Sequence, residues 1–175
     1  MVEPQPSKLA MPVRSRSPAP VLGICPHSYR GPSLEHSANA ARLAAGLVDR
    51  GHTVHYPGLP SHPQHALMSH LMNPGFGYGG VMTLDVGTRD RAARLMVGLQ
   101  ERRVGYLAVS LGYFKTLFSA PGSSTSSEIP VEKRHAMGLS DGLIRFSVGL
   151  DSDIARSLEA TLECLDELGP EPTDT

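Results

Sequence analysis

The residue with the clearest chemical implication is Arg145, which lies in the middle of the short apolar segment DGLIRFSVG. A charge inside an apolar strand is costly unless it is paired. The planar guanidinium can hold a carboxylate through two parallel hydrogen bonds, so a bound carboxylate is one explanation. A place on the solvent face of an edge strand, or an internal salt bridge, explains the residue equally well. The segment alone leaves these alternatives open.

Histidine is abundant in one stretch, where five residues fall within 19 positions: His52, His55, His62, His65 and His70. Histidines three or four residues apart on a helix can share a metal ion. Pro63 lies in the loop of one such pair, however, and no cysteine or carboxylate completes a ligand set. We therefore predict no metal site.

Three other patterns in the sequence do not predict a binding or catalytic site. The segment Asn73–Gly80 (NPGFGYGG) lacks the preceding strand and following helix of a dinucleotide fingerprint, so a hairpin-type connection is predicted. Ser110 and Cys164 have no base partner at a recognisable spacing, so no nucleophilic triad is expected, and Cys164 should be packed. The loop Pro121–Pro130 (PGSSTSSEIP) can line a polar pocket, but its composition favours a solvated loop.

Periodicity and capping residues predict the elements that must position these side chains. Four strands are expected, at Thr53–Tyr56, Val81–Val86, Val104–Val109 and Leu143–Val148. Helices are expected from Ser33 to about Arg50, from Pro63 to about Met72, after the cap Thr88, from Pro130 to near Gly138, and after a cap at Asp151 or Ser152. Strands separated by helices predict an α/β fold, with a small sheet of about four short strands covered by helices.

Three of these helices have a clear apolar face in the sequence. The first is expected to bury Leu34, Ala38, Ala41, Ala45 and Val48. The helix after Thr88 should bury Ala92, Leu95, Met96 and Leu99. The last should bury Ile154, Leu158, Leu162, Leu165 and Leu168.

Composition divides the chain into three parts. Residues 1–32 hold seven prolines and no periodic apolar pattern, so a disordered Pro/Ser/Arg-rich extension is predicted, which is favoured over an organelle transit peptide. Residues 33–168 are expected to form one folded domain. Residues 169–175 should be a disordered tail, because Gly169-Pro170 is a strong helix stop.

The bulk numbers narrow the function classes. The 175 residues are 40% hydrophobic and 19% charged, which is typical of a globular domain. A net charge of −1 gives no reason to expect nucleic acid or anionic membrane as a partner. No apolar run approaches the ~18 residues that a membrane helix needs. Cys25 and Cys164 lie far apart, which fits a reducing compartment, so we expect a cytoplasmic protein.

Four ordered motifs give the chain a family resemblance. They are HSANAARLA (36–44), YPGLPSHPQH (56–65), GFGYGGVMTLDV (75–86) and the long segment 109–152, which contains VSLG, PGSSTS and GLIRFSVG. Over about residues 34–168 the chain resembles the C-terminal domain of the pyridoxal-phosphate enzymes of cysteine and methionine metabolism, of the cystathionine γ-synthase and methionine γ-lyase type. The resemblance implies the C-terminal domain of a fold-type I pyridoxal-phosphate enzyme, acting by β/γ-elimination or γ-replacement on sulfur-containing or O-acylated amino acids.

The resemblance also implies roles for particular residues. Arg145 would bind the substrate α-carboxylate, and Ser110 of the VSLG motif would assist it. Ser123 and Thr125 would border the mouth of the active site, in a loop where Ser126 replaces the family's histidine. Many members have an acidic residue at the position of Lys115, and this departure leaves the reaction and substrate undefined.

The family's Schiff-base lysine is not matched in this sequence. The three lysines are Lys8 in the Pro-rich extension, Lys115 after the VSLG turn and Lys133 in the charged start of a short helix, and none is expected to be buried. We therefore expect a truncated or split enzyme that is inactive alone and provides the carboxylate site for an amino-acid substrate. A lysine-bearing partner chain or a homo-oligomer would complete it. A non-catalytic module that docks on an intact homologue, or an inactive gene remnant, is the alternative.

Overall fold

A five-stranded sheet organises the chain, in a computed structural model that describes residues 26–124 and 128–169. The strand order is β1-β2-β5-β4-β3, so β5 lies at the centre. Only β3 and β4 are parallel, and the other neighbours are antiparallel. The strands are β1 (Thr53–His55), β2 (Val81–Asp85), β3 (Tyr106–Leu107), β4 (Leu117–Ser119) and β5 (Leu143–Ser147).

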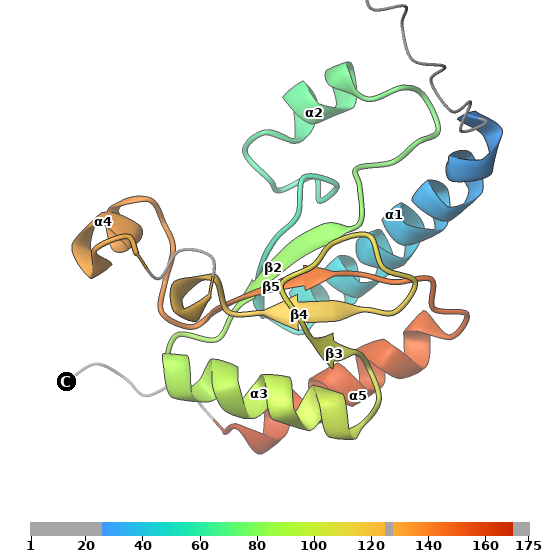
Figure 1. Cartoon of the computed structure of the whole chain (residues 1–175). Helices are drawn as coiled ribbons and strands as arrows, with labels where there is room; N and C mark the ends of the chain where they lie inside the picture. The colour runs from blue at the N-terminus through green and yellow to red at the C-terminus, as the bar shows by residue number, and fades with distance from the viewer. Residues whose placement is uncertain (1–25, 125–127, 170–175) are drawn as a thin grey trace, which may run out of the picture.

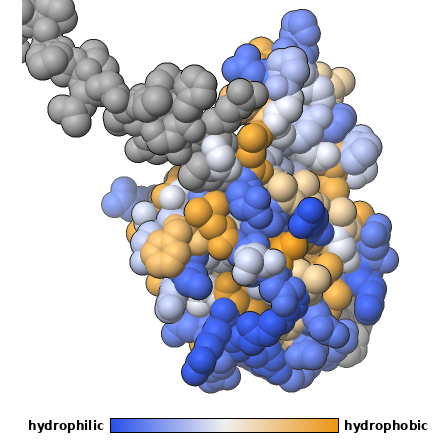
Figure 2. All heavy atoms as spheres, turned by 90° about the vertical axis from the view of Figure 1, so that its right-hand side faces the viewer, coloured by the Kyte–Doolittle hydropathy of each residue, from blue (hydrophilic) through white to orange (hydrophobic). Residues whose placement is uncertain are grey.

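Three long helices cover one face of this sheet. They are α1 (Pro26–Asp49), α3 (Arg89–Glu101) and α5 (Ile154–Glu167). The short helices α2 (His65–Leu71) and α4 (Val131–Ala136) project away from this layer (Figure 1), and the 3-10 turn η1 (Pro121–Ser123) follows β4. On the side seen in Figure 2, hydrophobic residues reach the surface mainly in the middle part, while hydrophilic residues gather at the lower end, where α3 and α5 lie in Figure 1.

The core lies between the three helices and one face of the sheet. Alternate residues of β2 and β5 contribute Met82, Leu84, Ile144 and Phe146, each at most 1% exposed. The helices contribute Leu43, Leu47, Leu95 and Leu99. Burying each such side chain stabilises the fold by about 1.5–3 kcal/mol, so this layer holds the sheet in place.

The structure confirms the predicted α/β class and adds one strand. β4 was missed because it has only three residues, all of them buried, and shows no alternation of polar and apolar residues. The helix after Thr88 is confirmed, since Thr88 accepts a hydrogen bond from the Arg91 backbone N–H and the four predicted residues are buried.

Two helix predictions were wrong in detail. α1 begins at Pro26, so residues 26–32 are helical instead of belonging to a disordered extension. Proline fits the first turn of a helix because its N–H is not needed there. Residues 1–25 of the predicted extension lie outside the described part. The buried face of α1 is Ser37, Asn39, Ala40, Leu43, Ala44 and Leu47, whereas the predicted Ala38, Ala45 and Val48 are exposed. Alanines all round the helix made the two faces indistinguishable in the sequence.

The last helix is capped at Asp153, just after the two predicted cap positions Asp151 and Ser152. The Asp153 side chain accepts from the Arg156 backbone N–H, and Gly169 ends the segment with φ of +71°. Its buried face includes Ser157 and Thr161, with Leu158, Leu162 and Leu168 only partly buried. The rest of the predicted tail lies outside the described residues. In the described ranges, no helix is long and apolar enough to cross a membrane.

Candidate functional site

Arg145 lies on the face of the sheet that the long helices leave uncovered. Its neighbours Ile144 and Phe146 belong to the core, and side chains alternate along a strand, so Arg145 points the other way. We call this the open face, formed by the outward residues of the three central strands: Val81, Thr83, Asp85, Leu117, Ser119, Leu143, Arg145 and Ser147. β5 is the central strand, so the edge-strand explanation of Arg145 is wrong.

The guanidinium of Arg145 is poorly satisfied within the described residues. Its Nη2 donates to the Ser110 carbonyl at 3.4 Å, which is long for an N–H···O hydrogen bond. Its Nε is buried and has no hydrogen-bond partner among the residues that the structure describes. None of the ion pairs found there involves Arg145. The internal salt bridge considered above is therefore not observed in this part of the chain.

A second unsatisfied group lies beside Arg145. Ser119 of β4 is its register partner, is only 6% exposed, and its Oγ also lacks a hydrogen-bond partner in the described ranges. Side chains at paired positions on adjacent strands lie within contact distance. An unpaired buried polar group costs about 1–3 kcal/mol, so two neighbouring ones are unusual. An N–H and an O–H donor on one side of the sheet suit an anion with two oxygens.

Ser119 was not found from the sequence. A serine at the end of a three-residue strand carries no periodic signal, and β4 itself was missed. Once the strand is known, its alternation indicates the position of Ser119. Phe118 lies in the core, so its neighbours Leu117 and Ser119 point to the other face of the sheet.

The predicted helper Ser110 lies next to Arg145, in the loop between β3 and β4. The contact is made by its backbone carbonyl, and its side chain is exposed. The loop is fixed to the open face because the Gly112 N–H donates to Ser147 Oγ at 3.0 Å. Gly112 has φ of +68°, a conformation that favours glycine and turns the loop toward the sheet. A role of the Ser110 hydroxyl at a carboxylate stays a prediction.

A hollow adjoins Ser110 on the side toward β3. It has a volume of about 420 Å³ and is lined by Tyr106, Ala108, Ser110, Tyr113, Phe114, Lys115 and Leu117. The Tyr113 and Phe114 rings pack with centroids 4.4 Å apart, and Lys115 Nζ lies 5.8 Å from the Phe114 centroid. Three of the seven lining residues are aromatic and Lys115 adds a positive charge, and this mostly apolar lining suits an apolar side chain.

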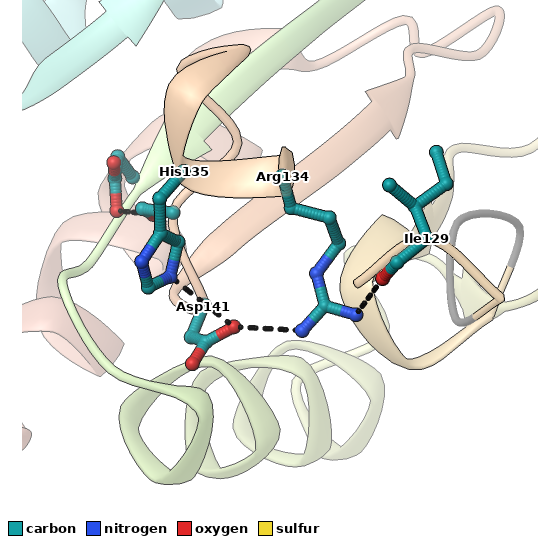
Figure 3. Close-up of polar contacts among 6 residues, drawn as sticks. Ile129, Arg134, His135 and Asp141 are labelled. Carbon is teal, nitrogen blue, oxygen red and sulfur yellow. Dashed lines mark hydrogen bonds and ion pairs between the residues drawn. The ribbon is translucent and has the colours of Figure 1, made fainter. Parts of the chain in front are cut away.

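The predicted mouth loop is anchored on its far side by Arg134 of α4. Figure 3 shows its guanidinium between the Ile129 carbonyl and the Asp141 carboxylate, each at 3.2 Å. Arg134 is only 4% exposed, and His135 also approaches Asp141 at 3.8 Å. Ser123 lies in η1, directly after β4, while Thr125 lies outside the described residues. The loop thus begins two residues after Ser119 and ends beside an ion pair whose arginine is buried and whose carboxylate is partly exposed.

The remaining sequence candidates do not form a site in the described ranges. No group of three His, Cys, Asp or Glu side chains there is arranged to hold a metal ion. His65 instead bonds to the Pro57 carbonyl at 2.8 Å and stacks on Tyr78. Cys164 is buried, as predicted, and burial raises the pKa of its thiol, which makes it a poor nucleophile at neutral pH.

Comparison with known proteins gives a consistent family. Residues 34–163 match the sequence profile of the family described as Cys/Met metabolism PLP-dependent enzyme. The chain is 47% identical over 116 residues to methionine gamma-lyase from Arabidopsis thaliana, covering 66% of this chain and 26% of that protein. It is 35% identical over 129 residues to cystathionine gamma-lyase from Bacillus subtilis, covering 69% and 32%. The chain therefore spans between a quarter and a third of the length of these relatives.

Solved structures agree with this result. Cystathionine gamma synthase from Xanthomonas oryzae pv. oryzae, in complex with aminoacrylate and cysteine, superposes with a TM-score of 0.69 at 31% identity, covering 79% of this chain and 35% of that one. Cystathionine gamma-lyase from yeast gives 0.69 at 28% identity, covering 78% and 34%. The fold and the order of its elements are shared with these enzymes.

Proposed function

The chain belongs to the Cys/Met metabolism PLP-dependent enzyme family, and on this premise we propose that residues 33–168 provide the substrate-carboxylate site of a transsulfuration-type enzyme. The proposed reaction class is β/γ-elimination or γ-replacement on a sulfur-containing or O-acylated amino acid. The names of the relatives, which include methionine gamma-lyase, cystathionine gamma-lyase and O-succinylhomoserine sulfhydrylase, support this range of substrates.

One observation carries the proposal. Arg145 lies on the central strand, on the open face, with a buried Nε that has no partner in the described residues. A carboxylate at this position would supply the missing acceptor and would be held by two parallel hydrogen bonds. Holding the α-carboxylate fixes the orientation of the bonds at the substrate Cα, and this positioning is the contribution we assign to the chain.

Pyridoxal phosphate is the cofactor that the family implies, and its chemistry when bound is to withdraw electrons from the bonds at the substrate Cα. A lysine that bonds to this cofactor needs a buried setting. Lys115 and Lys133 are both exposed, and Lys8 lies outside the described part. The described residues thus fit the substrate carboxylate and do not fit the cofactor-binding lysine.

We propose that a lysine-bearing polypeptide segment outside the described residues packs on the open face and completes the site. The open face supports this proposal, because the long helices cover only the opposite face of the sheet. Exposed apolar side chains border it on the loop after β3: Val109, Leu111, Tyr113 and Phe114. The same surface suits a non-catalytic module that docks on an intact homologue. We place the protein in the cytoplasm, where widely spaced cysteines stay reduced.

Nuclear magnetic resonance of the arginine side chains tests the carboxylate role directly. The Nε–Hε signal of Arg145, assigned by its loss in Arg145→Lys, should shift saturably with L-methionine. It should not shift with 3-(methylthio)propylamine, which has the same side chain and amine but no carboxylate. Arg103→Lys, at an exposed arginine, is the matched control and should leave the titration unchanged. An Arg145 Nε–Hε signal whose chemical shift does not change with L-methionine would refute the proposed function.

A further inference from the structure

We propose that Ser119 is a second ligand of the substrate carboxylate, donating its hydroxyl beside Arg145. This inference rests on the proposed function and extends it to a residue that neither the sequence motifs nor the family comparison assigns. It makes the carboxylate site a pair of residues on adjacent strands, β4 and β5, instead of a single arginine with help from the loop.

Burial and register support this pairing. Ser119 and Arg145 are directly opposite one another in the antiparallel β4–β5 ladder. Ser119 is 6% exposed, and its Oγ and the Arg145 Nε are both buried without a hydrogen-bond partner in the described ranges. Thr83 lies at the matching position on the other side of Arg145 but is only half-buried. The unsatisfied donors therefore lie on the β4 side.

Two other buried hydroxyls near Ser119 have a structural role, because each holds a loop against the sheet. Ser147, on the same face of β5, accepts from the Gly112 N–H at 3.0 Å. Thr116, just before β4, accepts from the Gly149 N–H at 3.0 Å. Each of these buried hydroxyls ties a loop to the sheet. Ser119 makes no such contact within the described residues, although the β5 backbone and the Arg145 side chain lie next to it.

A carboxylate satisfies both groups at once. Its two oxygens offer enough lone pairs to accept from the guanidinium fork of Arg145 and from one hydroxyl. Without a ligand, the two donors stay desolvated and unpaired, which destabilises the chain. Ligand binding removes this penalty. Ser119 would therefore lower the stability of the ligand-free chain and raise the affinity for the carboxylate. A structural serine would instead raise the stability of the chain.

The first test is the affinity for L-methionine, followed at the Arg145 Nε–Hε signal. Ser119→Ala should raise the Kd by about tenfold, the effect of one lost hydrogen bond to a charged group. Ser119→Cys fills nearly the same space with a weak donor and should lose affinity similarly. Ser152→Ala, at an exposed serine just before α5, is the control and should leave the Kd unchanged.

The second test is urea unfolding of the ligand-free chain. Ser119→Ala should unfold at the same urea concentration as wild type or at a higher one, because an unsatisfied buried hydroxyl is removed. Unchanged affinity in Ser119→Ala would overturn the inference, as would a lower urea midpoint accompanying the loss of affinity. If the Arg145 signal of the wild type does not respond to L-methionine, the proposed function itself fails. The two failures are therefore distinguishable.

Discussion

Arg134 and Arg145 resemble one another in the burial of the side-chain Nε and differ in their hydrogen-bond and ion-pair partners. Arg134 and Arg145 each have a buried Nε without a partner in the described residues. Arg134 also donates to the Ile129 carbonyl and forms an ion pair with Asp141, so its charge is neutralised inside the fold. Among the residues that the structure describes, Arg145 has only a long contact to the Ser110 carbonyl. Of these two arginines, Arg134 is therefore a structural residue, and Arg145 is the one to which we assign the proposed carboxylate site.

Tyr56 allows a prediction at the same scale, because its hydroxyl connects two segments. It lies 3.2 Å from the Ser37 carbonyl of α1 and 3.0 Å from the Gly79 carbonyl of the glycine-rich loop. At pH 8, Tyr56→Phe should lower the free energy of unfolding by about 1 kcal/mol, the usual value of one hydrogen bond. Urea unfolding measures this difference. The matched control Tyr106→Phe removes an exposed hydroxyl and should change it by less than ~0.5 kcal/mol.

The pH dependence of the Tyr56 effect has a defined sign. Burial raises the pKa of the Tyr56 hydroxyl above its ordinary value of about 10. A raised folded-state pKa gives stability that is complete below the unfolded pKa and is lost as the pH rises through the folded one. The difference between wild type and Tyr56→Phe should therefore shrink as the pH is raised above about 10. A difference that stays constant up to pH ~11 would contradict this explanation.

At the scale of elements, Gly149 sets how closely the loop before β4 approaches the end of β5. A Cβ on Gly149 would lie 2.4 Å from the Lys115 carbonyl carbon and 2.5 Å from the Thr116 nitrogen, both of them backbone atoms. Gly149→Ala should therefore displace this loop and lower the free energy of unfolding by about 1–3 kcal/mol, as urea unfolding can measure.

A glycine in open space provides the comparison for Gly149. Gly31 lies within α1, and a Cβ there meets nothing within 4 Å. Gly31→Ala should raise the free energy of unfolding by about 0.5–1 kcal/mol, because alanine loses less conformational freedom on entering a helix. If Gly149→Ala and Gly31→Ala changed the free energy of unfolding equally, the close approach of the loop before β4 to Gly149 would not contribute to stability.

The elements that the sequence predicted well are those with a local signal. Thr88 capped its helix, and the apolar spacing after it matched the buried residues, because cap and periodicity lie within one stretch of chain. The open face could not be predicted, since it depends on which strands neighbour β5 and on where the helices cross. Ser119 became recognisable only when the β4–β5 register placed it beside Arg145.

At the scale of the whole molecule, residues 26–124 and 128–169 form one sheet that long helices cover on a single face. The candidate ligand-binding groups lie on the opposite face. The chain spans 26% of the methionine gamma-lyase and 32% of the cystathionine gamma-lyase that it matches. An interface at the open face would bring a partner's lysine toward Arg145 and bury the exposed side chains of the loop after β3. In the function that we propose, carboxylate binding and docking therefore use one surface.

The most direct measurement of the central claim is turnover with and without Arg145. Residues 34–163 can replace the matching region of the methionine gamma-lyase from Arabidopsis thaliana, which supplies the rest of the enzyme. The chimera should consume L-methionine, and Arg145→Ala should lower its kcat/KM by about 100-fold or more, corresponding to ~3 kcal/mol. A chimera whose kcat/KM stays within about twofold after Arg145→Ala would contradict the assignment of Arg145 to the substrate carboxylate.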